Sequence, residues 1–188
     1  MRKYLLLLLA LSFAPWAQGA FDIAQLMQGL ASHPGGKARF TEKKFLAVLD
    51  RPIVATGEMT YLPPDRLEKR TLTPRPELLL LDRDTLSIER DKQRFSISLS
   101  QQPEARAFVD SIRSTLAGDR SALEKSYLLH LSGQPEKWTL TLLPSDQRIA
   151  SLIQRIVVTG SRNQILSIEY LQADGDRSLL NIEPIPAK

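Results

Sequence analysis

The stretch that decides the fold covers residues 40–76 and contains the sequence Gly57-Glu58-Met59-Thr60-Tyr61-Leu62-Pro63-Pro64. Within residues 53–62, the apolar side chains of Met59 and Tyr61 alternate with polar ones. Alternation with a period of two indicates a β-strand with one buried face. Pro63-Pro64 cannot donate hydrogen bonds to a neighbouring strand, so the strand must end there and the next begins near residue 66.

The same period recurs along most of the chain. It predicts strands at 38–46, 53–62, 66–72, 77–82, 85–90 and 94–99, and again at 126–132, 136–143, 153–160, 164–172 and 177–183. Most links between these segments are short and rich in turn-forming residues, as in Asp82-Arg83-Asp84 and Asp174-Gly175-Asp176. Links of this length favour antiparallel neighbours.

Two regions change to a helical period. Residues 22–32 carry apolar side chains at helical spacing, with Asp22 as the N-cap and His33-Pro34-Gly35-Gly36 as the stop. A second helix is predicted from Pro103 to Gly118, and a third, shorter one runs from Asp119 to about Lys125. Residues 144–147 are expected to form a loose turn.

The predicted fold is α+β and mainly β. Eleven antiparallel strands with one apolar face would curl around the helices that cover that face. Residues 20–188 would form a single domain, because no linker, repeat or low-complexity segment divides them.

The order of these features resembles the LolA family of periplasmic lipoprotein carriers. Besides Gly57-x-Met59-x-Tyr61 before a Pro-containing turn, the motifs that carry the resemblance are Leu116-Ala117-Gly118-Asp119, Trp138-x-Leu-x-Leu-x-Pro144 and Ile156-x-Val-x-Gly160. The resemblance covers essentially the whole mature chain. It implies an incomplete eleven-stranded antiparallel β-barrel (a half-barrel), with an N-terminal helix and a mid-chain helical pair covering its concave apolar face.

The chain departs from this family at one position. Classical carriers have Arg-Pro in the turn where this chain has Pro63-Pro64, and that Arg holds the helical lid shut. Arg66 and Arg70 lie downstream, but neither matches the missing Arg by position.

The N-terminus has the pattern of a signal peptide. Arg2-Lys3 precedes the apolar run from Tyr4 to Phe13, and Ala17-x-Gly19 offers the small residues of a cleavage site after Gly19. Export would place the protein in the periplasm and lower its net charge from +4 to +2. The remaining basic residues are interspersed with acidic ones, so nucleic acid is not an expected partner. The chain has no cysteine and therefore no disulfide or thiol chemistry.

No residue pattern indicates catalysis, a metal site or a cofactor. His33 and His130 are far apart in sequence, and no metal-ligand spacing accompanies either of them. The paired aspartates at Asp82/Asp84 and Asp174/Asp176 lie in predicted turns, where their side chains bond to the backbone. An enzyme on this scaffold would need polar residues converging in the cavity, which the alternation pattern does not show.

The apolar face is the candidate site. The side chains expected to point into it are Phe40, Met59, Tyr61, Leu67, Ile88, Phe95, Ile97, Phe108, Ile112, Leu116, Trp138 and Leu140. On residue patterning alone, these side chains form either a closed core or the lining of a cavity. The resemblance favours a cavity that shelters the acyl chains of lipoproteins or another lipid-like cargo. It also implies a non-enzymatic monomer that is loaded by an inner-membrane exporter and delivers to an outer-membrane acceptor. A periplasmic assembly factor with a packed interior, or less readily an enzyme using the cavity, remains the alternative.

Overall fold

The computed structural model describes residues 21–186, so the expected signal peptide lies outside the described residues. The helical elements are α1 (Ile23–Ala31), η1 (Leu99–Gln101, a 3-10 turn), α2 (Pro103–Ala117), α3 (Arg120–Leu123) and α4 (Gln147–Ala150). The strands are β1 (Gly36–Phe45), β2 (Ile53–Leu62), β3 (Arg66–Thr73), β4 (Glu77–Asp82), β5 (Thr85–Arg90), β6 (Gln93–Ser98), β7 (Tyr127–Gln134), β8 (Lys137–Pro144), β9 (Ile153–Ser161), β10 (Gln164–Gln172) and β11 (Arg177–Ile185). The predicted fold class and order of elements are confirmed.

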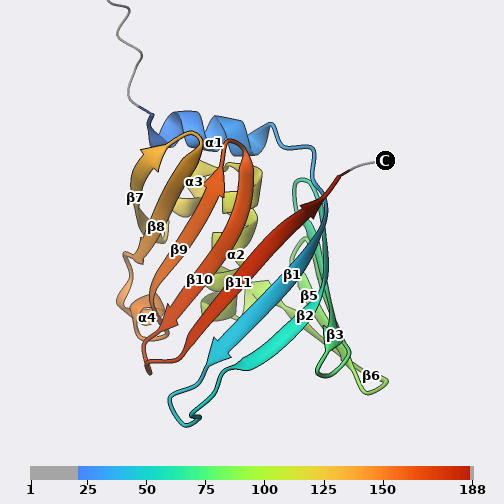
Figure 1. Ribbon diagram of the computed structural model, residues 1–188. Helices are drawn as coiled ribbons and strands as arrows, with labels where there is room; N and C mark the ends of the chain where they lie inside the picture. The colour runs from blue at the N-terminus through green and yellow to red at the C-terminus, as the bar shows by residue number, and fades with distance from the viewer. Residues whose placement is uncertain (1–20, 187–188) are drawn as a thin grey trace, which may run out of the picture.

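The described strands form one antiparallel sheet in the order β6-β5-β4-β3-β2-β1-β11-β10-β9-β8-β7. The first and last strands pair in the middle of the sheet, where Phe40 of β1 lies opposite Ile182 of β11. The sheet does not close, because β6 and β7 end it on opposite sides. It curls around α2 and α3, while α1 lies across one end (Figure 1).

The helix boundaries follow the capping residues that the sequence predicts. Asp22 accepts a hydrogen bond from the Gln25 backbone nitrogen at 2.8 Å, and the Gln25 side chain bonds back to Asp22. Pro103 begins α2, and Gly118 ends it with a left-handed φ of 65°. Asp119 caps α3 by accepting from the Ala122 nitrogen at 3.0 Å.

The interior contains two apolar clusters rather than one. The larger joins α1 and α3 to strands β7–β10 and includes Trp138 and Leu140. The smaller joins Tyr61, Leu67 and other residues of the first half of the sheet to α2. Phe108, Ile112 and Leu116 of α2 pack against both clusters. Helix α2 therefore bridges the two halves of the sheet.

One local prediction was wrong, and one short helix was not predicted. Strand β6 ends at Ser98, and Leu99, expected inside a strand, begins η1 and is fully buried. Helix α4 follows the loose turn expected at residues 144–147 and begins at its last residue, and Asp146 caps it by accepting a hydrogen bond from the Arg148 nitrogen.

A close approach in the larger cluster generates a stability prediction. Gly160 of β9 lies opposite Trp138, and a Cβ at Gly160 would come within 2.2 Å of the indole ring. Trp138 cannot move easily, because it is buried and its Nε1 donates to the Arg162 carbonyl at 2.9 Å. We expect Gly160→Ala to lower the free energy of unfolding by about 1–3 kcal/mol in urea denaturation.

The matched control is Gly29→Ala in α1. A Cβ there meets only Asn163 at 3.8 Å, an ordinary contact. Because alanine favours a helix more than glycine does, the free energy of unfolding of this variant should rise by about 0.5–1 kcal/mol. Equal effects of the two substitutions would contradict the packing argument.

Candidate functional site

An apolar pocket of about 580 Å³ lies between α2 and the concave face of the sheet. Ile112 and Leu116 of α2 form one wall, and Met59, Tyr61 and Leu67 of β2 and β3 form another. The rest of the lining comes from the end of α1, the segment after it, and strands β1, β10 and β11. Its volume lies within the range of about 300–1,000 Å³ that is typical of small-molecule sites.

The twelve candidate residues fall into three groups. Five line this pocket: Met59, Tyr61, Leu67, Ile112 and Leu116. Four belong to packed regions around it: Phe40, Phe108, Trp138 and Leu140. The remaining three lie on β5 and β6 and pack into neither apolar cluster: Ile88, Phe95 and Ile97.

The third group lies on strands that α2 does not cover fully. Phe95 is 59% exposed and Ile97 is 40% exposed, although their cross-strand partners Ile88 and Leu86 are half-buried. The sequence predicted the face of the sheet for these residues, and their cross-strand pairs lie on one face, but it did not predict that Phe95 and Ile97 are exposed.

A larger hollow of about 640 Å³ lies on the other face of α2. It is lined by the charged side chains of Arg106, Asp110, Arg113 and Asp119 among others. A lining of this kind does not suit an apolar chain, because charged groups lose hydration against it. The pocket beside Ile112 is therefore the better candidate.

The concave face also holds a polar network that the sequence analysis did not anticipate. Glu42 of β1 is only 8% exposed and accepts hydrogen bonds from Lys69 Nζ at 2.5 Å and from Ser178 Oγ at 2.8 Å. The Lys69 ammonium lies 4.9 Å from the centre of the Phe40 ring. This network lies outside the apolar pocket, whose lining includes neither Glu42 nor Lys69. The alternation of Phe40 and Glu42 with outward residues is the signal that could have revealed the network.

The environment of Glu42 lowers its pKa. Burial alone would raise the pKa, but the charge and hydrogen bond of Lys69, with help from Lys44 and Ser178, outweigh it. Glu42 is therefore an ionised, paired carboxylate at neutral pH.

The charge of Glu42 also acts on Tyr170. Burial, together with the charge of Glu42, raises the pKa of Tyr170, whose ring contacts Phe108 with centroids 4.8 Å apart.

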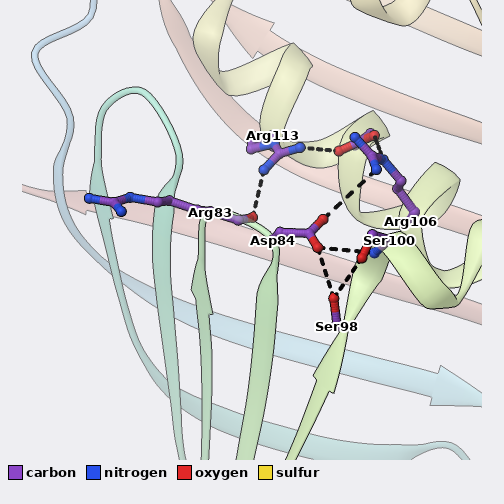
Figure 2. A network of polar contacts seen from close by, with 7 residues as sticks. Arg83, Asp84, Ser98, Ser100, Arg106 and Arg113 are labelled. Carbon is purple, nitrogen blue, oxygen red and sulfur yellow. Dashed lines mark hydrogen bonds and ion pairs between the residues drawn. The ribbon is translucent and has the colours of Figure 1, made fainter.

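A second polar network ties α2 to the turn between β4 and β5 (Figure 2). Arg113 donates to the Arg83 carbonyl at 2.8 Å and also bonds to Asp110. Arg106 lies 3.8 Å from an oxygen of Asp84. We call these contacts of Arg106 and Arg113 with the turn residues Arg83 and Asp84 the α2 anchor.

Asp84 is itself held by the end of β6. Its Oδ2 accepts hydrogen bonds from Ser98 Oγ at 2.9 Å and from the Ser100 nitrogen at 3.1 Å (Figure 2). The Ser98 hydrogen bond is the main reason that the pKa of Asp84 lies below its ordinary value. In this chain the arginines that hold the helix come from α2 itself.

Within residues 21–186, no group of three or more metal-ligating side chains comes together. None of the helices in this part of the chain is long and apolar enough to cross a membrane.

The Glu42 network generates a pH prediction. Because the pKa of Glu42 lies below its ordinary value of 4.5, its stabilising contribution is complete above pH 4.5 and is lost as the pH falls through the folded value. Glu42→Gln should lower the free energy of unfolding at pH 7 by about 1–3 kcal/mol, because it leaves Lys69 without its charged acceptor.

The measurement is urea denaturation at pH 7 and at pH 3. The difference between the wild type and Glu42→Gln should shrink at the lower pH. Glu89→Gln, at an exposed carboxylate of β5, is the control and should change little. A difference that is the same at both pH values would contradict the ionic role of Glu42.

The α2 anchor predicts a local change in dynamics. Arg113→Gln should speed amide hydrogen exchange in α2 roughly tenfold, because a lost charge-assisted hydrogen bond lowers the free energy of local opening by about 1.5 kcal/mol. The control is Arg120→Gln, which removes an ion pair to Glu124 that does not involve α2. Unchanged exchange in α2 of the folded Arg113 variant would show that the anchor does not hold the helix.

Solved structures with low sequence identity resemble this fold. The LolA superfamily protein NE2245 from Nitrosomonas europaea is 10% identical, with a TM-score of 0.47 over 90% of this chain and 96% of that one. Lipoprotein LppX from Mycobacterium tuberculosis is 9% identical, with a TM-score of 0.47 over 88% and 96%. A chain of the Pseudomonas aeruginosa MucA/MucB complex is 17% identical, with a TM-score of 0.46 over 89% of this chain and 59% of that one.

The family comparison in sequence covers most of the chain. No curated protein matches at a significant level. Residues 15–182 match the family described as "Outer membrane lipoprotein carrier protein LolA-like". This range includes every described helix and all the candidate residues, with only the end of β11 outside it. The chain therefore belongs to the LolA-like family of outer membrane lipoprotein carrier proteins.

Proposed function

We propose that this protein is a periplasmic carrier that shelters an apolar chain in the pocket between α2 and the concave face of the sheet. The carried chain belongs to a lipoprotein or to another lipid-like molecule. The observation that carries the proposal is the open apolar volume of about 580 Å³ between α2 and the concave face of the sheet. A packed structural core would fill that volume with side chains.

The energetics of binding suit a carrier. Burial of an acyl chain gains about 0.8 kcal/mol for each CH₂ group, so ten buried groups gain roughly 8 kcal/mol before the costs of ordering. Release then requires the lid to open at modest cost. The contacts that would hold α2 as a lid are partly exposed, since Arg106 and Asp84 both face solvent in part. Ion pairs of this kind contribute little free energy.

The proposed transport cycle involves two partner proteins and no catalysed reaction. An inner-membrane exporter loads the cargo, and an outer-membrane acceptor receives it. The protein acts as a monomer and uses no cofactor. Membership of the LolA-like family and the signal-peptide pattern of residues 1–19 support this cycle.

One observation favours a second candidate function, that of a periplasmic assembly or interaction factor. Strand β6 is an edge of the sheet and exposes Phe95 and Ile97. An edge strand with exposed apolar side chains can pair with a strand of another protein. Such a protein would not need to bind a lipid.

A ligand titration separates the two candidates. We expect the wild type to bind a fluorescent fatty-acid analogue at one site, and Ile112→Asp to weaken binding at least tenfold, because the carboxylate would lose hydration in the occupied pocket. Circular dichroism would verify that the variant is folded. Leu128→Asp on β7 is the control, because Leu128 is 65% exposed and outside the pocket.

Two outcomes would contradict the proposal. If the folded Ile112→Asp variant binds as tightly as the wild type, the pocket beside α2 is not the site. If the wild type binds no apolar probe at all, the assembly function becomes the better account.

A further inference from the structure

A groove of about 310 Å³ lies on the concave face at the end of the sheet away from Pro63. The ends of β1, β3 and β5 and the starts of β2 and β4 form it. We call it the cationic groove, and its charged lining consists of Glu42, Lys44, Lys69, Arg75, Glu77 and Arg90. Four cations therefore face two carboxylates.

Two of the four cations are each paired with a carboxylate of the groove. Lys69 donates to Glu42 at 2.5 Å, and Arg90 donates to Glu77 through Nε at 2.7 Å and again through a terminal nitrogen. These pairs neutralise both carboxylates of the groove. The surplus positive charge is carried by the other two.

Lys44 and Arg75 keep their donors available. Lys44 reaches Glu42 only at 3.8 Å, and Arg75 reaches Asp91 only at 3.7 Å. Both side chains are more than half exposed, and neither donates a hydrogen bond to a described residue. A carboxylate or phosphate group entering the groove would find charge and unused N–H groups together.

The cationic groove begins where the apolar pocket ends. Met59, which lines the pocket, lies directly opposite Lys69 across the β2–β3 pair, so both side chains lie on the same face of the sheet. The Lys69 ammonium also lies over the Phe40 ring, which packs against Gly57 between the two regions. An apolar surface and a cationic one therefore meet at a single cross-strand pair.

From this juxtaposition we infer that the cargo is an anionic amphiphile, with its apolar chain in the pocket and its carboxylate or phosphate head in the cationic groove. The inference rests on the proposed carrier function and names the chemical class of its cargo. Lys44 and Arg75 bind the head, while Lys69 and Arg90 are held in place by Glu42 and Glu77.

The test compares two ligands that differ only in the head group. Isothermal titration of the purified protein with oleate and with oleyl alcohol, both as monomers, gives the preference for the charged head. We expect oleate to bind about tenfold more tightly than oleyl alcohol, because one additional charge-assisted hydrogen bond changes the dissociation constant by about that factor. The preference should shrink as the salt concentration rises, because the groove is open to solvent.

The double variant Lys44→Ala/Arg75→Ala should lose the preference and keep the wild-type affinity for oleyl alcohol. Lys43→Ala is the matched control, because Lys43 is the neighbouring lysine on the opposite face of β1 and should leave the preference intact. Should the double variant fold poorly, Arg75→Glu alone tests the same point. It replaces an exposed side chain and should favour the alcohol.

A competition experiment with inorganic phosphate completes the test. Phosphate that competes with oleate but not with oleyl alcohol would support a head-group site. Phosphate binding without any preference between oleate and the alcohol would mean that the groove takes a free anion, and it would overturn the inference. Equal binding of both ligands by the wild type would also overturn it while leaving the carrier function standing. If neither ligand binds, the carrier function itself fails.

Discussion

The structure depends on one constraint, which is that a single open sheet must hide one apolar face with few helices. Neighbouring strands lie roughly 4.8 Å apart, so a helix roughly 10 Å wide covers about two of them. Helices α1 and α3 cover β7–β10, and α2 bridges the two halves through Phe108, Ile112 and Leu116. The concave side of β1–β6 is wider than α2 can cover. The exposed side chains of β6 and the cationic groove follow from this mismatch, and the apolar pocket lies where α2 meets the middle of the sheet.

The elements themselves could be predicted from sequence because their signals are local. A period of two located every strand to within a few residues, and the caps at Asp22, Pro103 and Gly118 fixed the ends of α1 and α2. The candidate site was less predictable, since alternation gives the face of a side chain but not what covers it. Phe95 shows this, because it lies on a strand with the expected pattern and is still exposed. The α2 anchor had no sequence signal, since Arg113 binds a backbone carbonyl whose position only the folded turn defines.

The interior of this protein combines two kinds of contact that serve a carrier differently. Apolar contacts along α2 are non-directional and strengthen with the area of cargo that they bury. The polar contacts of the α2 anchor and of Glu42 are directional, so they fix where α2 and the strands lie when the pocket is empty. Because most side chains of the α2 anchor remain partly hydrated, breaking the anchor contacts costs only about 1–2 kcal/mol, less than the burial of an acyl chain gains. Under the proposed function, this balance would let α2 close over a bound chain and open again without unfolding the sheet.

The most direct test of the carrier account is mass spectrometry of the organic extract of this protein, purified from periplasm without detergent. The account predicts a lipid or an acylated protein in near-stoichiometric amount, released on extraction from the apolar pocket. An extract without lipid, together with a protein that takes up no lipid when mixed with membranes, would contradict the account. The apolar pocket would then be a packing feature of a protein that acts through its surface.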